Sequence, residues 1–355
     1  MMFCFLGHAV GSPCPTLVMD VTELPRDDDG LLTAIRRARR ALRRRGLAEV
    51  LKFALIRPSD HPLFDLDYRF VQCLPGDGGD DFDTRGSCGH SILVSVQAAS
   101  RFGWVRDLTP GRRIRVRVVG HHEHVVCELD GVNRTGHEFT SHFVYSPELR
   151  LGGGLPTGSV RDELEGPDGP IPVTLATFSN PYVFVPAHRL GIHDEETLFG
   201  EDEGLYGTLQ DLRAQGARRL GLAPRGSFPK IACVGAFHPG SLSLRAISVP
   251  RWHPSVALTG AACVAATSVV RGSVPHELAR TTGGQPGRLR LRTAGGAAEV
   301  GVSATGVTPD DLLRWISIAG RTVRSLGGVR LPELEGLRRS AVDDEENATW
   351  LPLNV

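Results

Sequence analysis

Two short segments differ from the rest of the chain because nearly every position in them is apolar or small. They are residues 91–103 (SILVSVQAASRFG) and 261–270 (AACVAATSVV). A helix that is apolar on all sides must be buried. The pattern therefore predicts two central helices, each enclosed by other elements of the fold.

Strand-like runs rich in β-branched and aromatic residues precede and follow each central helix. In the first half they are 52–56, 68–74, 113–119 and 124–131; in the second half they are 171–178, 182–187, 230–236, 288–293 and 297–304. Apolar residues at helical spacing predict further helices over 29–46, 208–222 and from Pro309 to about Leu326.

The two halves thus repeat one plan, in which a β-sheet wraps around a central apolar helix. We expect an α+β protein with two pseudo-symmetric domains, separated near the glycine-rich stretch 152–160. The first domain is predicted to cover 1–155, joined by the C-terminal segment 330–355, and the second to cover 156–329.

Composition narrows the class of protein. Lys+Arg and Asp+Glu both number 40 in 355 residues, and this balance argues against a nucleic-acid binder. No stretch approaches the 18 apolar residues of a membrane span, and the N-terminus lacks the pattern of a signal peptide. Seven cysteines without a CxxC pair favour a reducing compartment. We therefore expect a cytoplasmic protein without membrane or nucleic-acid partners. The sequence does not decide between a monomer and a homodimer.

Only two of the forty basic residues are lysines, namely Lys52 and Lys230. A partly desolvated lysine can give or take a proton, whereas arginine stays protonated. The alternative is that both lysines survive by chance in a chain that favours arginine.

Cys88 lies in the sequence Ser87-Cys88-Gly89-His90, which opens the first central helix. Backbone N–H groups at a helix start stabilise negative charge, so a cysteine there can act as an acid or base. Thr259-Gly260 opens the second central helix in the same way. If the halves face each other, both helix starts point at one interdomain cleft, between which a di- or tricarboxylate would fit.

Six motifs in the same order resemble the family of 2-methylaconitate cis-trans isomerases and 4-oxalomesaconate tautomerases, which has a diaminopimelate epimerase-like fold. The resemblance runs from about Lys52 to about Pro332. DLDYRFVQC is similar to the family's DVDYLFAQV, SCGHSILVSVQAA to NCGNMLAAVGPFA, and GGGLPTGSVRDEL to GKLLPTGNVVDTL. FSNPYVFVPAHRLGI is similar to AANPVVFVRAADLGL, FPKIACV to SPKVAFV, and ALTGAACVAATSVVRGSV to AGTGAVCLAAAARIPGTV.

The resemblance implies catalytic roles for Lys52 and Cys88 and no cofactor. It also implies a set of substrate-binding residues: Gly89, His90, Asn180, Lys230, His253, Thr259 and Gly260. Epimerases of this fold that use two thiols carry a second cysteine before the second central helix, where this chain has Ala257-Leu258. Racemisation by two thiols is therefore not expected.

The chain departs from the family around the expected substrate. The family's RGGTSKG loop is replaced by GHAVGSPCP (7–15), and its SSTS run by 47–51 (LAEVL). Of the HRAY before the second central helix only His253 is kept. A site that has lost donors for carboxylates should bind polyanions poorly. We therefore expect a less anionic substrate, outside the tricarboxylates.

The resulting hypothesis is a cofactor-independent isomerase that acts on a small unsaturated acid or carbonyl compound. Proton transfer would shift a C=C bond, or isomerise it between cis and trans. The alternative is a recruited family member of a specialised biosynthetic pathway, acting as a cyclase-like catalyst or a non-catalytic binding protein. The histidines at 121, 122 and 124 offer no third ligand at a fixed offset, so no metal site is predicted.

Overall fold

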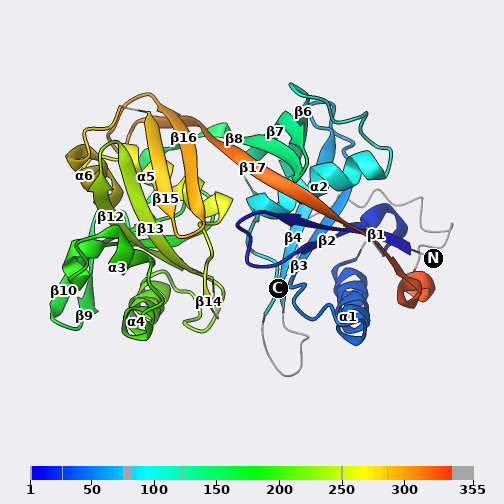
Figure 1. Cartoon of the computed structure of the whole chain (residues 1–355), viewed down its shortest axis with the longest axis horizontal. Coiled ribbons are helices and arrows are strands. Elements are labelled where there is room, and N and C mark those ends of the chain that lie inside the picture. Colours follow the sequence, from blue (N-terminus) through cyan, green and yellow to red (C-terminus); the bar gives the residue numbers. More distant parts are fainter. Residues whose placement is uncertain are drawn as a thin grey trace. The chain divides into compact units, whose positions relative to one another are not determined.

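The computed structural model of the chain describes residues 2–25, 27–74, 82–121, 123–248, 251–285 and 287–337. His122 and residues 338–355 of the predicted C-terminal segment lie outside this set. The chain forms two compact units, one of residues 1–140 and 321–355 and the other of residues 141–320. We call them unit 1 and unit 2 and describe each by itself (Figure 1).

Two long strands belong to both units, because each continues without a break across a unit boundary. They are β8 (Gly136–Arg150) and β17 (Leu312–Leu331). The sequence analysis placed the boundaries at 155 and 329. Since no turn or linker marks residues 140 and 320, the sequence offers little signal for these boundaries.

Unit 1 is a sheet with helices on both faces. Its strands are β1 (Met2–Ala9), β2 (Thr16–Asp20), β3 (Lys52–Pro58), β4 (Leu66–Cys73), β5 (Phe82–Asp83), β6 (Arg113–Val118), β7 (Glu123–Asn133) and the ends of β8 and β17. The pairing order is β17-β1-β2-β3-β4, after which β4 pairs with both β5 and β6, and β6 pairs with β7. The β2–β3 and β4–β6 pairs are parallel and the others are antiparallel.

Two helices cover the opposite faces of this sheet. Helix α1 (Asp28–Arg44) begins at the N-cap Asp27, whose carboxylate accepts the N–H of Gly30 at 2.7 Å. Its apolar stripe packs on one face, where 3₁₀ turns over Val21–Glu23 and Pro332–Leu337 also lie. Helix α2 (Gly89–Arg101) packs against β1 to β4 on the other face, and residues 89–99 are all buried. The central helix predicted for this half is confirmed.

Unit 2 repeats the plan. Its strands are β9 (Asp162–Gly166), β10 (Gly169–Ala176), β11 (Tyr182–Pro186), β12 (Lys230–His238), β13 (Ser241–Ser248), β14 (Arg251–Trp252), β15 (Arg288–Thr293) and β16 (Gly296–Ala304). Its helices are α3 (Glu195–Phe199), α4 (Glu203–Arg219), α5 (Leu258–Val269) and α6 (Val274–Thr281), with 3₁₀ turns at Leu151–Gly154 and Ala187–Leu190. Strands β11 and β12 are parallel, as are β13 and β15. Helix α4 covers one face, and the buried α5 is the second central helix.

One predicted element is wrong. The segment from Pro309 to Leu326, expected to be an amphipathic helix, is the main part of strand β17. Its apolar residues fit a helical period, but the segment pairs with β16 in the first half of the strand and with β1 in the second. Ile316 and Ile318, two positions apart, are both buried, as expected where alternate residues of a strand face the core. Gly320 has a positive φ, which a helix does not allow.

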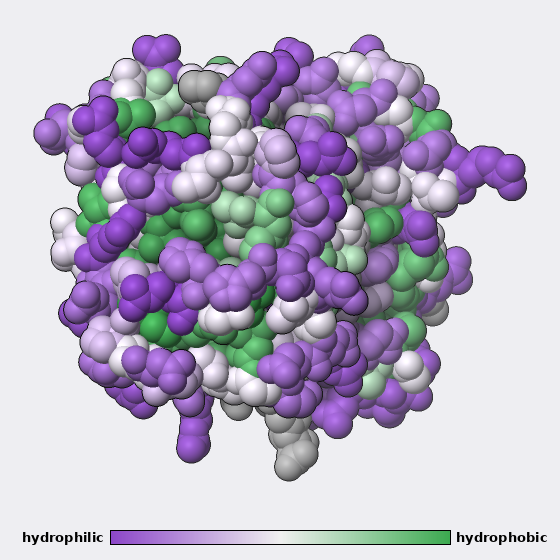
Figure 2. Space-filling model, turned by 60° about the vertical axis from the view of Figure 1, so that its left-hand side comes forward, coloured by the Kyte–Doolittle hydropathy of each residue, from purple (hydrophilic) through white to green (hydrophobic). Residues whose placement is uncertain are grey.

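The face of the molecule in Figure 2 is mainly polar. Hydrophilic residues cover most of the face shown in Figure 2, with smaller apolar areas between them. Among the described residues, no helix is both long and apolar enough to cross a lipid bilayer.

Candidate active site

Lys52 is the first residue of β3 and lies on the face of the sheet that α2 covers. Strand register places Thr16 of β2 and Gln72 of β4 on either side of Lys52. Opposite residues share a face of a sheet, and the Thr16 hydroxyl lies 2.9 Å from the hydroxyl of Ser91 on α2. The register therefore fixes Lys52 beneath the first turns of α2.

The ammonium group of Lys52 is buried in a polar setting. The residue is 6% exposed, and its Nζ donates a hydrogen bond to the Ser12 hydroxyl at 2.8 Å. That hydroxyl in turn donates to the carbonyl of Cys14 at 2.9 Å. A turn holds Ser12 in place, since its N–H donates to the carbonyl of Ala9. The loop between β1 and β2 thus supplies the direct partner of Lys52.

Cys88 is the N-cap residue of α2, and its side chain makes no capping hydrogen bond. It is 8% exposed. Its carbonyl accepts the Tyr68 hydroxyl at 3.1 Å and the N–H of Ile92 at 3.0 Å, which fixes the backbone of the helix start. Gly89 and His90 form the first turn of α2, and His90 is 1% exposed.

A second thiol lies at this site and was not singled out from the sequence. Burial raises the pKa of Cys14, while the charge of Lys52 and a hydrogen bond from the backbone of Leu51 lower it. The Cys88 thiol acts on the same pKa, so Cys14 lies within electrostatic range of both Lys52 and Cys88. Burial also raises the pKa values of Cys4, Cys73 and Cys233 to about 12, as expected for inert core thiols.

Sequence reasoning missed Ser12, Cys14, Thr16 and Ser91. From the sequence alone, the stretch 7–15 is interpreted as a carboxylate-binding loop without its charged residues. That interpretation gives no reason to predict its serine and cysteine side chains as site residues. The only signal available was that GHAVGSPCP occupies the place of a functional loop. The contact with Lys52 depends on the pairing of β1, β2 and β3, which the sequence does not specify residue by residue.

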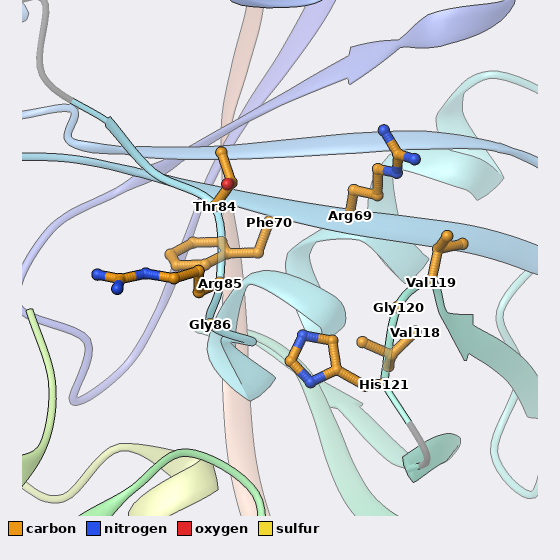
Figure 3. Close-up of a pocket in the computed structure, with 9 residues that line it drawn as sticks. All are labelled: Arg69, Phe70, Thr84, Arg85, Gly86, Val118, Val119, Gly120 and His121. Carbon is orange, nitrogen blue, oxygen red and sulfur yellow. The ribbon is translucent and has the colours of Figure 1, made fainter. Parts of the chain in front are cut away.

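A cavity of about 240 Å³ borders the segment that leads into α2. Figure 3 shows Thr84, Arg85 and Gly86 on this segment, facing Phe70 of β4 and His121 after β6. Arg69 also lines the cavity. Ion pairs with Asp83 and Asp28 partly balance Arg85 and Arg69. Lys52 and Cys88 do not line this cavity, so it is separate from their side chains.

In unit 2, the predicted residues Asn180, Thr259 and Gly260 come together at the start of α5. The side-chain amide of Asn180 donates to the Thr259 hydroxyl at 3.2 Å. Gly260 is required by close packing, because a Cβ there would lie 2.3 Å from the hydroxyl of Tyr182. The Asn-Pro element and the second helix start are therefore neighbours.

Lys230 and His253 occupy defined positions in the same unit. Lys230 begins β12, its N–H donates to the carbonyl of Pro181, and its Nζ lies 5.3 Å from the centre of the Phe228 ring. The Nδ1 atom of His253 accepts the N–H of Ser255 at 3.1 Å, so the ring of this buried histidine carries its proton on Nε2 when neutral.

Within the described ranges, no three His, Cys, Asp or Glu side chains lie together in a way that could hold a metal ion. Of the histidine cluster, His121 lines the cavity above and His124 packs on Phe64 with ring centres 4.6 Å apart.

Comparison with known proteins assigns the family. The family model described as PrpF protein matches residues 46–332. The chain belongs to this PrpF family. It is 26% identical to the 3-methylitaconate isomerase of Eubacterium barkeri over 65% of this chain and 71% of the relative. It is also 26% identical to the 4-oxalomesaconate tautomerase of Pseudomonas putida, over 71% of this chain and 74% of the relative.

Solved structures agree on the fold. A methylitaconate-delta-isomerase superposes with a TM-score of 0.66 at 22% identity and covers 96% of this chain and 97% of its own. A hydroxyproline epimerase from Agrobacterium vitis superposes with a TM-score of 0.62 at 17% identity, with 92% and 91% covered. The predicted diaminopimelate epimerase-like fold is confirmed, and so is the prediction that this PrpF family member is an isomerase.

Proposed function

We propose that this PrpF family member moves a proton between carbons next to a carboxylate or carbonyl, and so shifts or isomerises a C=C bond without a cofactor. Lys52 would be the main base or acid, and Cys88 its partner. The observation that carries the proposal is the position of Lys52. Lys52 is buried, its ammonium donates to a hydroxyl and lies within electrostatic range of the Cys14 thiol, and the residue is on the sheet face under the start of α2.

The chemistry follows from the surroundings of the two groups. Removing a proton next to a carbonyl creates enolate-like charge, which backbone N–H groups at a helix start stabilise. The first turn of α2, at Gly89 and His90, offers such groups beside Cys88. The Ser12 hydroxyl accepts a hydrogen bond from the Lys52 ammonium and so holds the lysine in one orientation.

The substrate proposed is a small unsaturated acid or carbonyl compound that is less anionic than a tricarboxylate. The replacement of RGGTSKG by GHAVGSPCP supports this restriction, since the loop at Lys52 now offers Ser12 and Cys14 instead of cationic side chains. In unit 2, we propose that Asn180, Lys230, His253, Thr259 and Gly260 contribute to substrate binding.

We further propose a reducing, cytoplasmic location, which is supported by the seven cysteines that are all free thiols. A homodimer is compatible with this proposal and is tested by the molar mass in solution.

The direct test is exchange with solvent deuterium. The wild-type enzyme is incubated in deuterated water with a panel of small unsaturated acids, and NMR follows the carbon-bound hydrogens. We expect deuterium at the carbon next to the carboxylate, at the allylic carbon, or at both. An acid that is isomerised without taking up deuterium would contradict proton exchange with solvent-equilibrated Lys52 or Cys88. Turnover that is unchanged after loss of both side chains would instead support the recruited, shape-based function.

A further inference from the structure

Arg321 is a buried arginine of β17, and none of the residues that the structure describes forms an ion pair with it. The residue is 8% exposed, and its Nε is buried without a hydrogen-bond partner. Burial lowers the pKa of Arg321 to about 10, and no neighbouring charge contributes to this shift. An uncompensated buried cation is costly in free energy, and an anionic ligand that supplies the counter-charge would remove this cost.

The other buried arginines of the described residues differ from Arg321 in this respect. Arg39 and Arg213 donate to backbone carbonyls, Arg69 pairs with Asp28, and Arg245 lies over the Trp252 ring and near Glu201. Each therefore has a partner within its own unit. Arg321 has no corresponding partner among the residues that the structure describes.

Strand register places Arg321 on the same face of the unit 1 sheet as Lys52. Ala9 of β1 is opposite Val323, and alternation along β17 puts Arg321 on the face of Val323. On β1, Ala9 shares its face with Gly7, where a Cβ would touch Val94 of α2. Gly7 is opposite Thr16, and Thr16 is opposite Lys52. Both cations thus lie on the side that α2 covers.

The loop that holds Lys52 also borders Arg321. The carbonyl of Thr322 accepts the N–H of Val10 at 2.8 Å, and two residues further on Ser12 accepts the ammonium of Lys52. Strands β1 and β2 lie between the two cations, which corresponds to about 14 Å across the sheet between the backbones of β17 and β3. Two long cationic side chains on one sheet face at this backbone spacing are suited to hold separate ends of one small molecule.

We infer that Arg321 binds a carboxylate of the substrate at the end remote from the carbon that Lys52 deprotonates. The inference rests on the proposed function for the position of the reacting carbon. A guanidinium is suited to this role because its planar donors match both oxygens of a carboxylate. The N-terminal loop of this chain lacks the arginine and lysine of the family's loop. In this proposal Arg321 of β17 supplies the cation that binds the substrate carboxylate.

The test measures binding without turnover, so it is independent of the deuterium experiment. Thermal unfolding of the full chain is followed with itaconate, crotonate and the neutral crotonamide at constant ionic strength. A ligand that binds only the folded protein raises its melting temperature. We expect both carboxylates, and not the amide, to stabilise the wild type. R321M should abolish this shift without lowering the melting temperature of the ligand-free protein, because Met removes the unpaired charge and keeps most of the volume.

The matched control is R324M, since Arg324 is exposed on the other face of the same strand, opposite His8. It should keep the carboxylate shift. If R321M does not fold, R321K serves instead: it keeps the charge but loses the planar fork, and should weaken carboxylate affinity about tenfold or more. A wild type that no carboxylate stabilises, or an R321M or R321K variant with wild-type carboxylate affinity, would overturn the inference.

Discussion

The two units place a lysine at the same point of the same plan. Lys52 begins β3, which is parallel to β2 and antiparallel to β4. Lys230 begins β12, which is parallel to β11 and antiparallel to β13. Each lysine is opposite the first residue of the preceding parallel strand, Thr16 in unit 1 and Tyr182 in unit 2. The only two lysines of the chain are therefore structural equivalents.

The two lysines differ in burial and in the groups that surround their ammonium groups. Lys52 is buried and bonded to a hydroxyl, with a thiol in electrostatic range. Lys230 is partly exposed, with its ammonium beside the Phe228 ring. A ring face attracts the charged form of an amine. The comparison predicts that this backbone position serves general acid-base chemistry in unit 1 and substrate binding in unit 2.

The central helices show the same contrast. The N-cap is Cys88 in α2 and Ala257 in α5. Three residues later, Ser91 lies within hydrogen-bond distance of Thr16, whereas Gly260 makes room for the ring of Tyr182. At this position unit 1 thus has two hydroxyls within hydrogen-bond distance of each other, where unit 2 has close packing.

The largest expected effect, and the sharpest test of the contrast between Lys52 and Lys230, is the loss of turnover when the amine is removed. K52M should lower the turnover number of isomerisation about 10²- to 10⁴-fold, as expected for loss of a general acid or base. K230M should leave the turnover number within a few-fold and act mainly on the Michaelis constant, if at all. Steady-state kinetics on the substrate identified by deuterium exchange measures both.

K52R is the control for charge, since arginine keeps the positive charge but does not release its proton at working pH. It should be as inactive as K52M while its circular dichroism spectrum stays that of the wild type. Equal losses of turnover in K52M and K230M would show that the two lysines are functionally alike.

The next largest effect concerns the Cys88 thiol at the start of α2. C88A should lower turnover about 10²-fold or more, because it removes the partner acid or base at the start of α2. C233A, which alters a buried thiol of β12, should change stability and leave the turnover number of the folded enzyme unchanged. Turnover of C88A at the wild-type level would remove Cys88 from the mechanism.

Much of the fold could be predicted from the sequence, because the central helices are apolar all round and the strands are rich in β-branched residues. The segment after Pro309 could not, since Ile316, Ile318 and Val323 suit a strand as well as a helix and only pairing with β16 and β1 decides. Lys52 and Cys88 were found through motifs. Ser12 and Arg321 were not, because their proximity to the site arises from strand register across distant segments.

A smaller effect compares how much two contacts contribute to the free energy of unfolding: the close packing at Gly260 in unit 2 and the hydroxyl pair at Ser91 in unit 1. G260A should lower the free energy of unfolding by about 1–3 kcal/mol, since the new Cβ collides with the Tyr182 ring. S91A at the equivalent position should cost about 1 kcal/mol, from the lost hydrogen bond with Thr16. Urea unfolding measures both. In a Y182L background the cost of G260A should fall, and an unchanged cost would show that the ring is not the cause.

The smallest effect concerns the acid stability of unit 2. Hydrogen bonds from Arg292 lower the pKa of Glu195 from 4.5 to about 2, with further help from Ser243 and His238. A carboxyl whose pKa is lower in the folded state stabilises the protein above its unfolded pKa, and this contribution is lost as the pH falls from about 4.5 toward 2. E195Q should therefore be less stable than the wild type at neutral pH by no more than about 1 kcal/mol. The difference should vanish near pH 2. E196Q, which alters the exposed neighbour, should follow the wild type at every pH, and urea unfolding between pH 2 and 7 compares all three. A constant difference between E195Q and the wild type over this range would mean that packing, and not the ion pair with Arg292, accounts for the loss.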